Sequence, residues 1–313
     1  MTFPALVGAT AVGKTALSLE VAQQLDAELI SMDSRQVYRR MDVGTAKVDR
    51  ESRVLVPHHG LDLIDPSESY SAARFAREAR VWVHEIEGRG HLPIVVGGSG
   101  FFLRALIDPV FQEPAVSEDR RSRLRRWLSG CQREELVRWV QILDPARALL
   151  AEAGGPHRLS RSIEVPLLTG RPLSWWHREG PLEAKPLDVR VVLVELPRAE
   201  LYGRIDERTI RMFEDGLLEE ARQLLEAGYT VDDPGMTGTG YREALSVVLG
   251  DLDLAEALDR VQRATRGYAR RQLTWFRNQI PELAFRVDAS IPLVDQTEQV
   301  VRWWEGTGEH VRG

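Results

Sequence analysis

The chain has 313 residues, of which 43% are hydrophobic and 28% charged, a composition typical of one or two globular domains. No apolar run is long enough to span a bilayer and the N-terminus lacks a signal-peptide pattern, so we expect no membrane partner. The single cysteine, Cys131, excludes an intramolecular disulfide, and a location in the reducing cytoplasm is expected.

The net charge of −6 by itself argues against a nucleic-acid partner. However, only Lys14, Lys47 and Lys185 are lysines, so the positive charge is carried almost entirely by arginine, and the arginines are clustered. Arginine favours bidentate phosphate contacts and base stacking, and local charge matters more than the total for nucleic-acid binding.

A phosphate-binding motif opens the chain. An apolar run at residues 5–7 predicts a strand, and the apolar spacing of residues 16–25 predicts a helix. The segment between them reads G-x-x-x-x-G-K-T, a Walker A loop, whose N–H groups and lysine bind phosphate oxygens and whose threonine hydroxyl binds Mg²⁺. The loop consists of Gly8, Ala9, Thr10, Ala11, Val12, Gly13, Lys14 and Thr15. The alternative is a glycine-rich turn that binds nothing, although such a turn has no need of Lys14.

Two further strands are predicted at residues 27–31 and 93–96. Asp33 follows the first, at the strand end where ligands bind in parallel α/β sheets, so it either faces the phosphate loop or merely caps a turn. The second ends in Gly97-Gly98-Ser99-Gly100, without the acidic residue that binds Mg²⁺ in ATP-hydrolysing P-loop enzymes. Ser99 either donates a hydrogen bond to a phosphate or belongs to a simple glycine turn.

Residues 113–186 predict a helical insertion domain between two parts of the core, 1–112 and 187–313. Five arginines crowd its start: Arg120, Arg121, Arg123, Arg125 and Arg126. A run of charge is usually a solvent-exposed helix face, but few acidic residues lie among these arginines. They therefore either form such a face or contact the phosphate backbone of a nucleic acid. A strand at 188–196 then resumes the sheet, and a helix over 204–225 carries arginines toward it. We therefore expect an α/β fold, with a three-layer core like that of P-loop NTPases around a parallel sheet.

The helix predicted over residues 255–279 carries a row of arginines. At 100° per residue, Arg263, Arg266, Arg270 and Arg277 fall within about 60° of one another. Val261, Tyr268, Ala269, Trp275 and Phe276 lie on the opposite side, which we expect to face the core. Few acidic residues follow Asp259, so the row predicts a nucleic-acid phosphate contact, with Arg266 and Arg270 at its centre.

This set of motifs resembles the tRNA dimethylallyltransferase family over nearly the whole chain. The residues that carry the resemblance are Gly8 to Thr15, Asp33-Ser34-Arg35-Gln36-Val37-Tyr38, Gly44-Thr45-Ala46-Lys47, His58-His59, Gly97-Gly98-Ser99-Gly100, Arg158 with Arg161, Gly240-Tyr241-Arg242-Glu243, and the segment from Tyr268 to Arg277. The Walker loop alone is common to many proteins, whereas the second, fourth and last groups in this order are specific.

The resemblance implies that the loop binds the diphosphate of dimethylallyl diphosphate rather than ATP. The N6 atom of adenosine 37 in tRNA attacks the allylic carbon and pyrophosphate leaves. Asp33 corresponds to the general base, and Lys14, Ser99 and a Mg²⁺ held by Thr15 would neutralise the leaving group. We assign Arg208 to a further diphosphate contact.

The resemblance also implies binding of the anticodon stem-loop, with the adenosine flipped out of its stack. Residues expected to contact tRNA are Asp33, Ser34, Arg35, Gln36, Ser99, Arg121, His157, Arg158, Leu159, Ser160 and Arg161. Two residues depart from the family pattern: Ser99 replaces the usual threonine and His157 the usual glutamine. The C-terminal zinc finger of eukaryotic members is absent, which implies a bacterial-type enzyme, and we expect a monomer.

Three alternatives remain. A P-loop kinase for a small metabolite would use the same loop on ATP but would not need the arginine row. An adenylate isopentenyltransferase, which prenylates free AMP, would not need the helical insertion. An RNA-binding module with a relict loop would not need Asp33 and Ser99 at strand ends.

Overall fold

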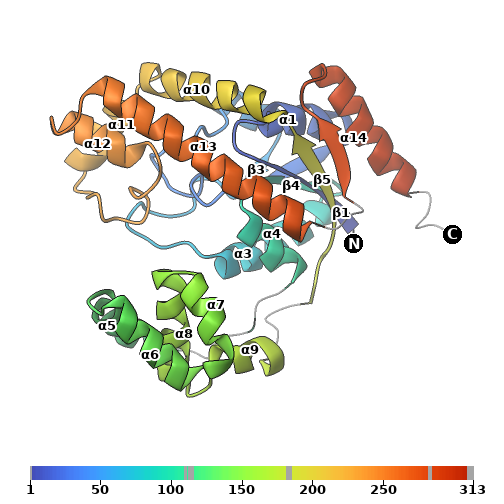
Figure 1. Cartoon of the computed structure of the whole chain (residues 1–313). Coiled ribbons are helices and arrows are strands. Elements are labelled where there is room, and N and C mark those ends of the chain that lie inside the picture. The colour runs from blue at the N-terminus through green and yellow to red at the C-terminus, as the bar shows by residue number, and fades with distance from the viewer. Residues whose placement is uncertain (1, 109–110, 112–115, 181–184, 281–283, 309–313) are drawn as a thin grey trace. The chain divides into compact units, whose positions relative to one another are not determined.

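The computed structural model describes residues 2–108, 111, 116–180, 185–280 and 284–308 (Figure 1). The chain forms two compact units: Met1–Asp108 with Leu187–Gly313, and Pro109–Pro186. The boundary predicted between residues 112 and 113 falls on residues outside those described.

The first unit is built on a six-stranded parallel sheet with the strand order β3-β2-β4-β1-β5-β6. The strands are β1 (Thr2–Gly8), β2 (Ala27–Met32), β3 (His58–His59), β4 (Leu92–Gly97), β5 (Asp188–Glu195) and β6 (Phe285–Asp288). In the central register, Leu6 of β1 lies opposite Val96 on one side and Val192 on the other. Nearly every residue of β1 and β2 is buried, because a parallel sheet is covered on both faces.

Helices cover both faces of this sheet. The helices of this unit are α1 (Lys14–Gln24), α2 (Arg50–Leu55), α3 (Ala72–Gly88), α4 (Gly100–Ile107), α10 (Arg198–Glu214), α11 (Leu217–Glu226), α12 (Tyr241–Val248), α13 (Leu254–Gln279) and α14 (Leu293–Gly308). Of these, α11 and α12 pack in a separate hydrophobic core rather than on the sheet. Figure 1 shows α1 and α14 on one side of the sheet and α3 and α4 on the other. Side chains alternate accordingly, and Leu6, Ile94 and Val192 join Leu17 of α1 and Val300 of α14 in one core.

The second unit is helical. Its elements are α5 (Glu118–Ser129), α6 (Arg133–Leu143), the 3₁₀ turn η1 (Pro145–Arg147), α7 (Ala148–Ala153), α8 (Pro156–Thr169) and α9 (Leu173–Glu179). Leu128, Val140 and Ile163 belong to a hydrophobic core of its own. Gly155, with φ 80°, precedes a proline at the first position of α8, a sequence that sets the start of a helix.

Two sequence predictions need correction. The helix predicted over residues 204–225 is two helices, because Gly216 adopts a left-handed conformation (φ 105°) between α10 and α11. Tyr268, expected in the core face of the last arginine-rich helix, is 39% exposed. Its position on the edge of that face directs it toward the cavity described below rather than into the core.

Candidate functional site

The Walker loop joins β1 to α1 in the conformation that phosphate binding requires. Gly13, the N-cap of α1, has φ 108°, and Ala11 has φ 63°, a strained value for a residue with a Cβ. The N–H groups of Gly13, Lys14 and Thr15 have no hydrogen-bond partner among the described residues. Unpartnered N–H groups at the N-terminus of a helix, where the helix dipole adds partial positive charge, are suited to holding an anion.

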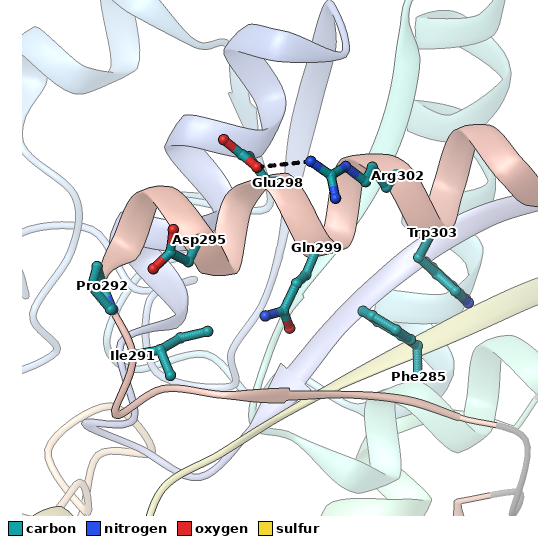
Figure 2. A pocket seen from close by; sticks show the side chains of 8 residues that line it. All are labelled: Phe285, Ile291, Pro292, Asp295, Glu298, Gln299, Arg302 and Trp303. Atoms are coloured by element: carbon teal, nitrogen blue, oxygen red, sulfur yellow. Dashed lines mark hydrogen bonds and ion pairs between the residues drawn. The ribbon is translucent and has the colours of Figure 1, made fainter.

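A cavity of about 640 Å³ opens over this loop. Eight of the predicted site residues line it: Thr10, Ala11, Gly13, Lys14, Thr15, Asp33, Gln36 and Arg208. Another hollow, of about 690 Å³, lies between β6 and α14, where the Phe285 and Trp303 rings stack (Figure 2). That hollow contains none of the predicted site residues, so the cavity over the loop is the candidate site.

Lys14 is the principal cation of the cavity. Its Nζ donates to the carbonyl oxygens of Gly8 at 3.0 Å and Ala9 at 2.7 Å. Burial lowers the pKa of Lys14 to about 7; the Asp33 charge opposes this shift and the Arg208 charge adds to it. An anionic ligand in the cavity would therefore restore the positive charge on this side chain.

Asp33 both caps a turn and faces the cavity, so the two roles left open by the sequence coexist. Its Oδ1 accepts the Arg35 N–H at 2.8 Å, and its carboxylate lies near enough to Lys14 and Arg208 to affect the pKa of each. One carboxylate thus faces two cations across a cavity, an arrangement suited to accepting a proton while the cations hold an anion.

Helix α10 turns three arginines, Arg204, Arg208 and Arg211, toward the cavity at helical spacing. Arg204 donates to the carbonyl oxygens of Val12 at 3.3 Å and Ala289 at 3.1 Å, so it braces the loop. Arg208 makes no hydrogen bond or ion pair with any described residue; burial lowers its pKa, and the Asp33 charge opposes the shift. Arg208 is therefore available to an anionic ligand.

Ser99 lies at the end of β4, directly after Gly98, but is not among the residues that line the cavity. Tyr268 of α13 does line it, and burial raises its pKa to about 12, with the Asp33 charge adding to the rise and a hydrogen bond with Ser99 opposing it. Ser99, Tyr268 and Asp33 are thus close together at one side of the cavity.

The other residues of the predicted Asp33–Gln36 contact hold the turn in place. The Gln36 side chain accepts from the Ser31 hydroxyl at 2.8 Å and donates to the carbonyl oxygens of Thr45 and Ala46. Arg35 donates to the Pro234 carbonyl oxygen at 2.9 Å. Ser34 is half-buried in the same turn and, like Arg35, does not line the cavity.

In the helical unit, Glu164 gathers three arginines, two of which were predicted to contact tRNA. It is 4% exposed, and it accepts hydrogen bonds from Arg121 at 3.0 Å, Arg125 at 3.0 Å and Arg161 at 3.1 Å. We call these four residues the Glu164 cluster. One buried carboxylate thus holds three guanidinium groups in place, and Arg121 and Arg161 have further partners besides it.

The remaining predicted residues of this unit differ in accessibility. His157 and Arg158 are exposed and Ser160 is half-buried at the start of α8. Leu159, in contrast, is wholly buried in the unit's core, which removes its side chain from the residues that can contact RNA. The helical period explains the correction, because Leu159 and Ile163 lie on the same inward face.

The arginine row of α13 is only partly free. Arg263 pairs with Asp259 at 2.5 Å, and Arg266 pairs with Asp206 of α10 at 3.0 Å. The expectation that the row lacks acidic partners was therefore wrong for these two, since the partner of Arg266 lies 60 residues away. Arg270 is exposed and has no side-chain partner among the described residues.

Sequence reasoning did not single out Arg204, Tyr268 or Gln272 for the site. Gln272 is buried and bonds to both the Walker loop and the end of β4. The helical period could have identified Gln272, because it places this glutamine in the middle of the apolar face of α13. A polar residue at such a position needs buried partners.

The fold and the cavity define the class: an α/β protein with a P-loop at the carboxyl ends of a parallel sheet, in which Lys14 and Arg208 lie near the carboxylate of Asp33. Residues 36–279 match the model of the IPP transferase family, and residues 1–54 match that of isopentenyl transferases. The chain belongs to the tRNA dimethylallyltransferase family and is therefore a transferase.

Named relatives and solved structures agree with this assignment. The chain is 40% identical to a tRNA dimethylallyltransferase of Heliobacterium modesticaldum, over 91% of this chain and 89% of that protein. It is 43% identical to one of Thermomicrobium roseum, over 87% and 82%. A full-length tRNA isopentenylpyrophosphate transferase of Bacillus halodurans superposes with a TM-score of 0.72 at 34% identity, over 99% and 97% of the two chains. The crystal structure of a eukaryotic dimethylallyltransferase acting on tRNA superposes with a TM-score of 0.79 at 27% identity, over 92% of this chain and 74% of that chain.

Proposed function

We propose that this chain transfers the dimethylallyl group of dimethylallyl diphosphate to N6 of adenosine 37 in the anticodon loop of tRNA. The observation that carries the proposal is the pairing of a P-loop anion site with Asp33 in one cavity, in a chain of this family. The bond between the allylic carbon and the diphosphate oxygen breaks, the bond from N6 to that carbon forms, and pyrophosphate leaves.

Each group in the cavity has a part in this reaction. The unpartnered N–H groups at the start of α1, with Lys14 and Arg208, hold the diphosphate and stabilise the charge that develops as it leaves. Asp33 accepts the proton that N6 loses. Ser99, whose hydroxyl lies beside Tyr268 and near Asp33, would contact the adenosine or the diphosphate.

A Mg²⁺ ion suits the residues present. Thr15 is exposed in the cavity and its hydroxyl makes no hydrogen bond with a described residue, so it is available as a hard oxygen ligand. The described residues contain no group of three or more His, Cys, Asp or Glu side chains that could hold a metal, so the remaining ligands would come from the diphosphate and water. When bound, the ion would offset negative charge on the leaving group.

The tRNA partner is supported by exposed positive charge in both units. Arg125 of the Glu164 cluster is half exposed, and His157 and Arg158 are exposed on α8. Arg270 of α13 extends the positive charge in the other unit. We expect a monomer to act.

The proposal is tested by incubating the protein with Mg²⁺ and labelled dimethylallyl diphosphate. Separate reactions contain unmodified tRNA with three adenosines at positions 36 to 38, AMP, or no acceptor. Label in the tRNA alone supports the proposal. Label in AMP would instead identify an adenylate isopentenyltransferase, and label in neither acceptor would overturn the proposal.

The role of Asp33 is tested by Asp33→Asn, which keeps the size of the side chain and can still accept the Arg35 N–H. We expect turnover to fall by about 10³-fold, within the range for loss of an acid–base catalyst, while tRNA affinity stays within a few-fold. If Asp33→Asn instead lost most of its tRNA affinity and kept nearly wild-type turnover at saturating tRNA, Asp33 would be a binding residue.

A further inference from the structure

Gln272 is a buried amide on an otherwise apolar helix face. It lies in α13 with 7% of its surface exposed, between Ala269 and Phe276, which are 0% and 1% exposed. A buried amide group costs free energy unless both its carbonyl oxygen and its NH₂ group find partners. An apolar residue would fill this position more simply, so the partners of Gln272 indicate its purpose.

Those partners belong to the two segments that carry the site. The Gln272 Oε1 accepts the backbone N–H of Thr10, in the Walker loop, at 2.9 Å. Its Nε2 donates to the carbonyl oxygen of Gly98, next to Ser99, at 2.9 Å. One side chain thus joins the loop assigned to the diphosphate to the turn that carries Ser99.

Glycines make this contact possible. A Cβ on Gly98 would collide with the Gln272 amide, and a Cβ on Gly100 would collide with the Trp275 ring one helical turn further along α13. Helix α13 is therefore pressed against the turn after β4, and the position of the Gln272 amide is fixed on both sides. The glycines of this turn serve close backbone approach rather than chain reversal alone.

The bond to Thr10 also sets which N–H groups of the loop face the ligand. With the Thr10 N–H given to Gln272, the N–H groups of Gly13, Lys14 and Thr15 at the start of α1 are among those of the loop that have no acceptor within the described part of the chain. The strained Ala11 lies between these two groups, and a loop in this conformation persists only when its surroundings hold it.

We propose that Gln272 is a positioning residue for the transfer reaction. It fixes the Walker loop relative to the turn of Ser99, and so fixes the leaving group relative to the attacking nucleotide. The inference rests on the proposed function, because it assigns the diphosphate to one side of this bridge and the adenosine to the other. It acts through the backbone groups of Thr10 and Gly98, although its side chain also belongs to the lining of the cavity.

The test begins with Gln272→Met, which keeps the length of the side chain and loses both hydrogen bonds. We expect kcat to fall by about 100-fold, the size of effect that a misplacement of about 1 Å produces, while KM for dimethylallyl diphosphate changes only a few-fold. The control is Gln262→Met on the same helix, which removes a bond to the Asp206 carbonyl oxygen outside the cavity and should leave kcat unchanged. Unaltered kcat in folded Gln272→Met overturns the proposal.

A second variant distinguishes loss of the hydrogen bonds from a mere change in packing, through the pH dependence of its activity. In Gln272→Glu the ionised carboxylate can accept the Thr10 N–H but cannot donate to Gly98, whereas the protonated carboxyl group can do both. Burial raises a glutamate pKa, so the activity of this variant relative to wild type should rise as the pH falls from 8.5 to 6, a range chosen to include that shift. A ratio that does not change with pH overturns the proposal, and this outcome decides the question if Gln272→Met does not fold.

A measurement independent of activity separates this inference from the proposed function. Hydrogen exchange of the Thr10 amide, followed by NMR, should be at least tenfold faster in Gln272→Met than in wild type, since the amide loses its acceptor. Exchange at the wild-type rate would show that Gln272 does not hold the loop. If the wild-type protein transfers no label but the Thr10 amide exchanges faster in Gln272→Met, the proposed function is wrong, and Gln272 still holds the Walker loop to the turn after β4.

Discussion

The cavity of the first unit and the Glu164 cluster of the second arrange positive charge in opposite ways. In the cavity, Lys14 and Arg208 face one distant carboxylate, and burial lowers the pKa of both. In the cluster, three arginines are hydrogen-bonded directly to one buried carboxylate. Among the described residues, the two cations of the cavity thus have no directly bonded carboxylate, whereas the three arginines of the cluster are held in place by one.

The comparison is tested most strongly by Lys14→Met. We expect transfer to fall by about 10³-fold, because a charged donor to the leaving group is lost. The melting temperature of the unliganded protein should instead rise by a few degrees, because a buried amino group without a bonded carboxylate is removed. Transfer of label to tRNA measures the first effect, and scanning calorimetry of the unliganded protein measures the second. A lower melting temperature would mean that Lys14 stabilises the empty cavity.

Glu164→Gln should have the opposite effect on stability. Removing the charge takes away the carboxylate that the three guanidinium groups share, and loss of one partner of a buried ion pair typically costs about 3–5 kcal/mol. We expect about 2–4 kcal/mol here, since Arg125 is half exposed. Urea unfolding followed by tryptophan fluorescence measures the change, with Glu152→Gln in the same unit as control. An unchanged midpoint would show that the arginines do not depend on Glu164.

The depressed pKa of Lys14 predicts a pH dependence of diphosphate binding. The folded, unliganded protein loses the Lys14 proton above about pH 7, whereas the unfolded chain keeps it to about 10.5. A bound diphosphate raises this pKa, so binding above pH 7 takes up a proton, and affinity falls by up to about tenfold per pH unit. Calorimetry of pyrophosphate binding at pH 8 in buffers of different ionisation enthalpy measures the uptake. Release of a proton, or none exchanged, would contradict the assignment.

The smallest expected effect is on the salt dependence of tRNA binding, and it should differ between Arg270 and Arg266 of α13. Arg270→Ala should lower the salt slope of tRNA binding by about 0.7–0.9, the contribution of one phosphate contact. Arg266→Ala should leave the slope nearly unchanged, because Arg266 is already paired with Asp206. Binding measured from 50 to 300 mM salt, a range chosen for the assay, compares the two variants. Equal effects would mean that the ion pair opens on binding.

The sequence predicted the parts of this molecule whose signals are local. The Walker loop, Asp33 after β2 and the parallel sheet follow from motifs and apolar periods within short segments. It could not predict contacts between distant segments, such as Asp206 with Arg266 or Gln272 with Thr10. It also missed β6 and α14, because no motif or strong period marks the chain beyond Pro281.

The strand order has a consequence for the synthesis of the chain. Strand β1, the first to leave the ribosome, lies between β4 and β5, and its pairing with β5 waits until the whole helical insertion has been made. The Walker loop then waits further for Gln272. Nascent chains can therefore complete the core of the insertion well before the Walker loop has all its contacts, and a chain released before α13 is made has a loop that lacks the hydrogen bond from Gln272.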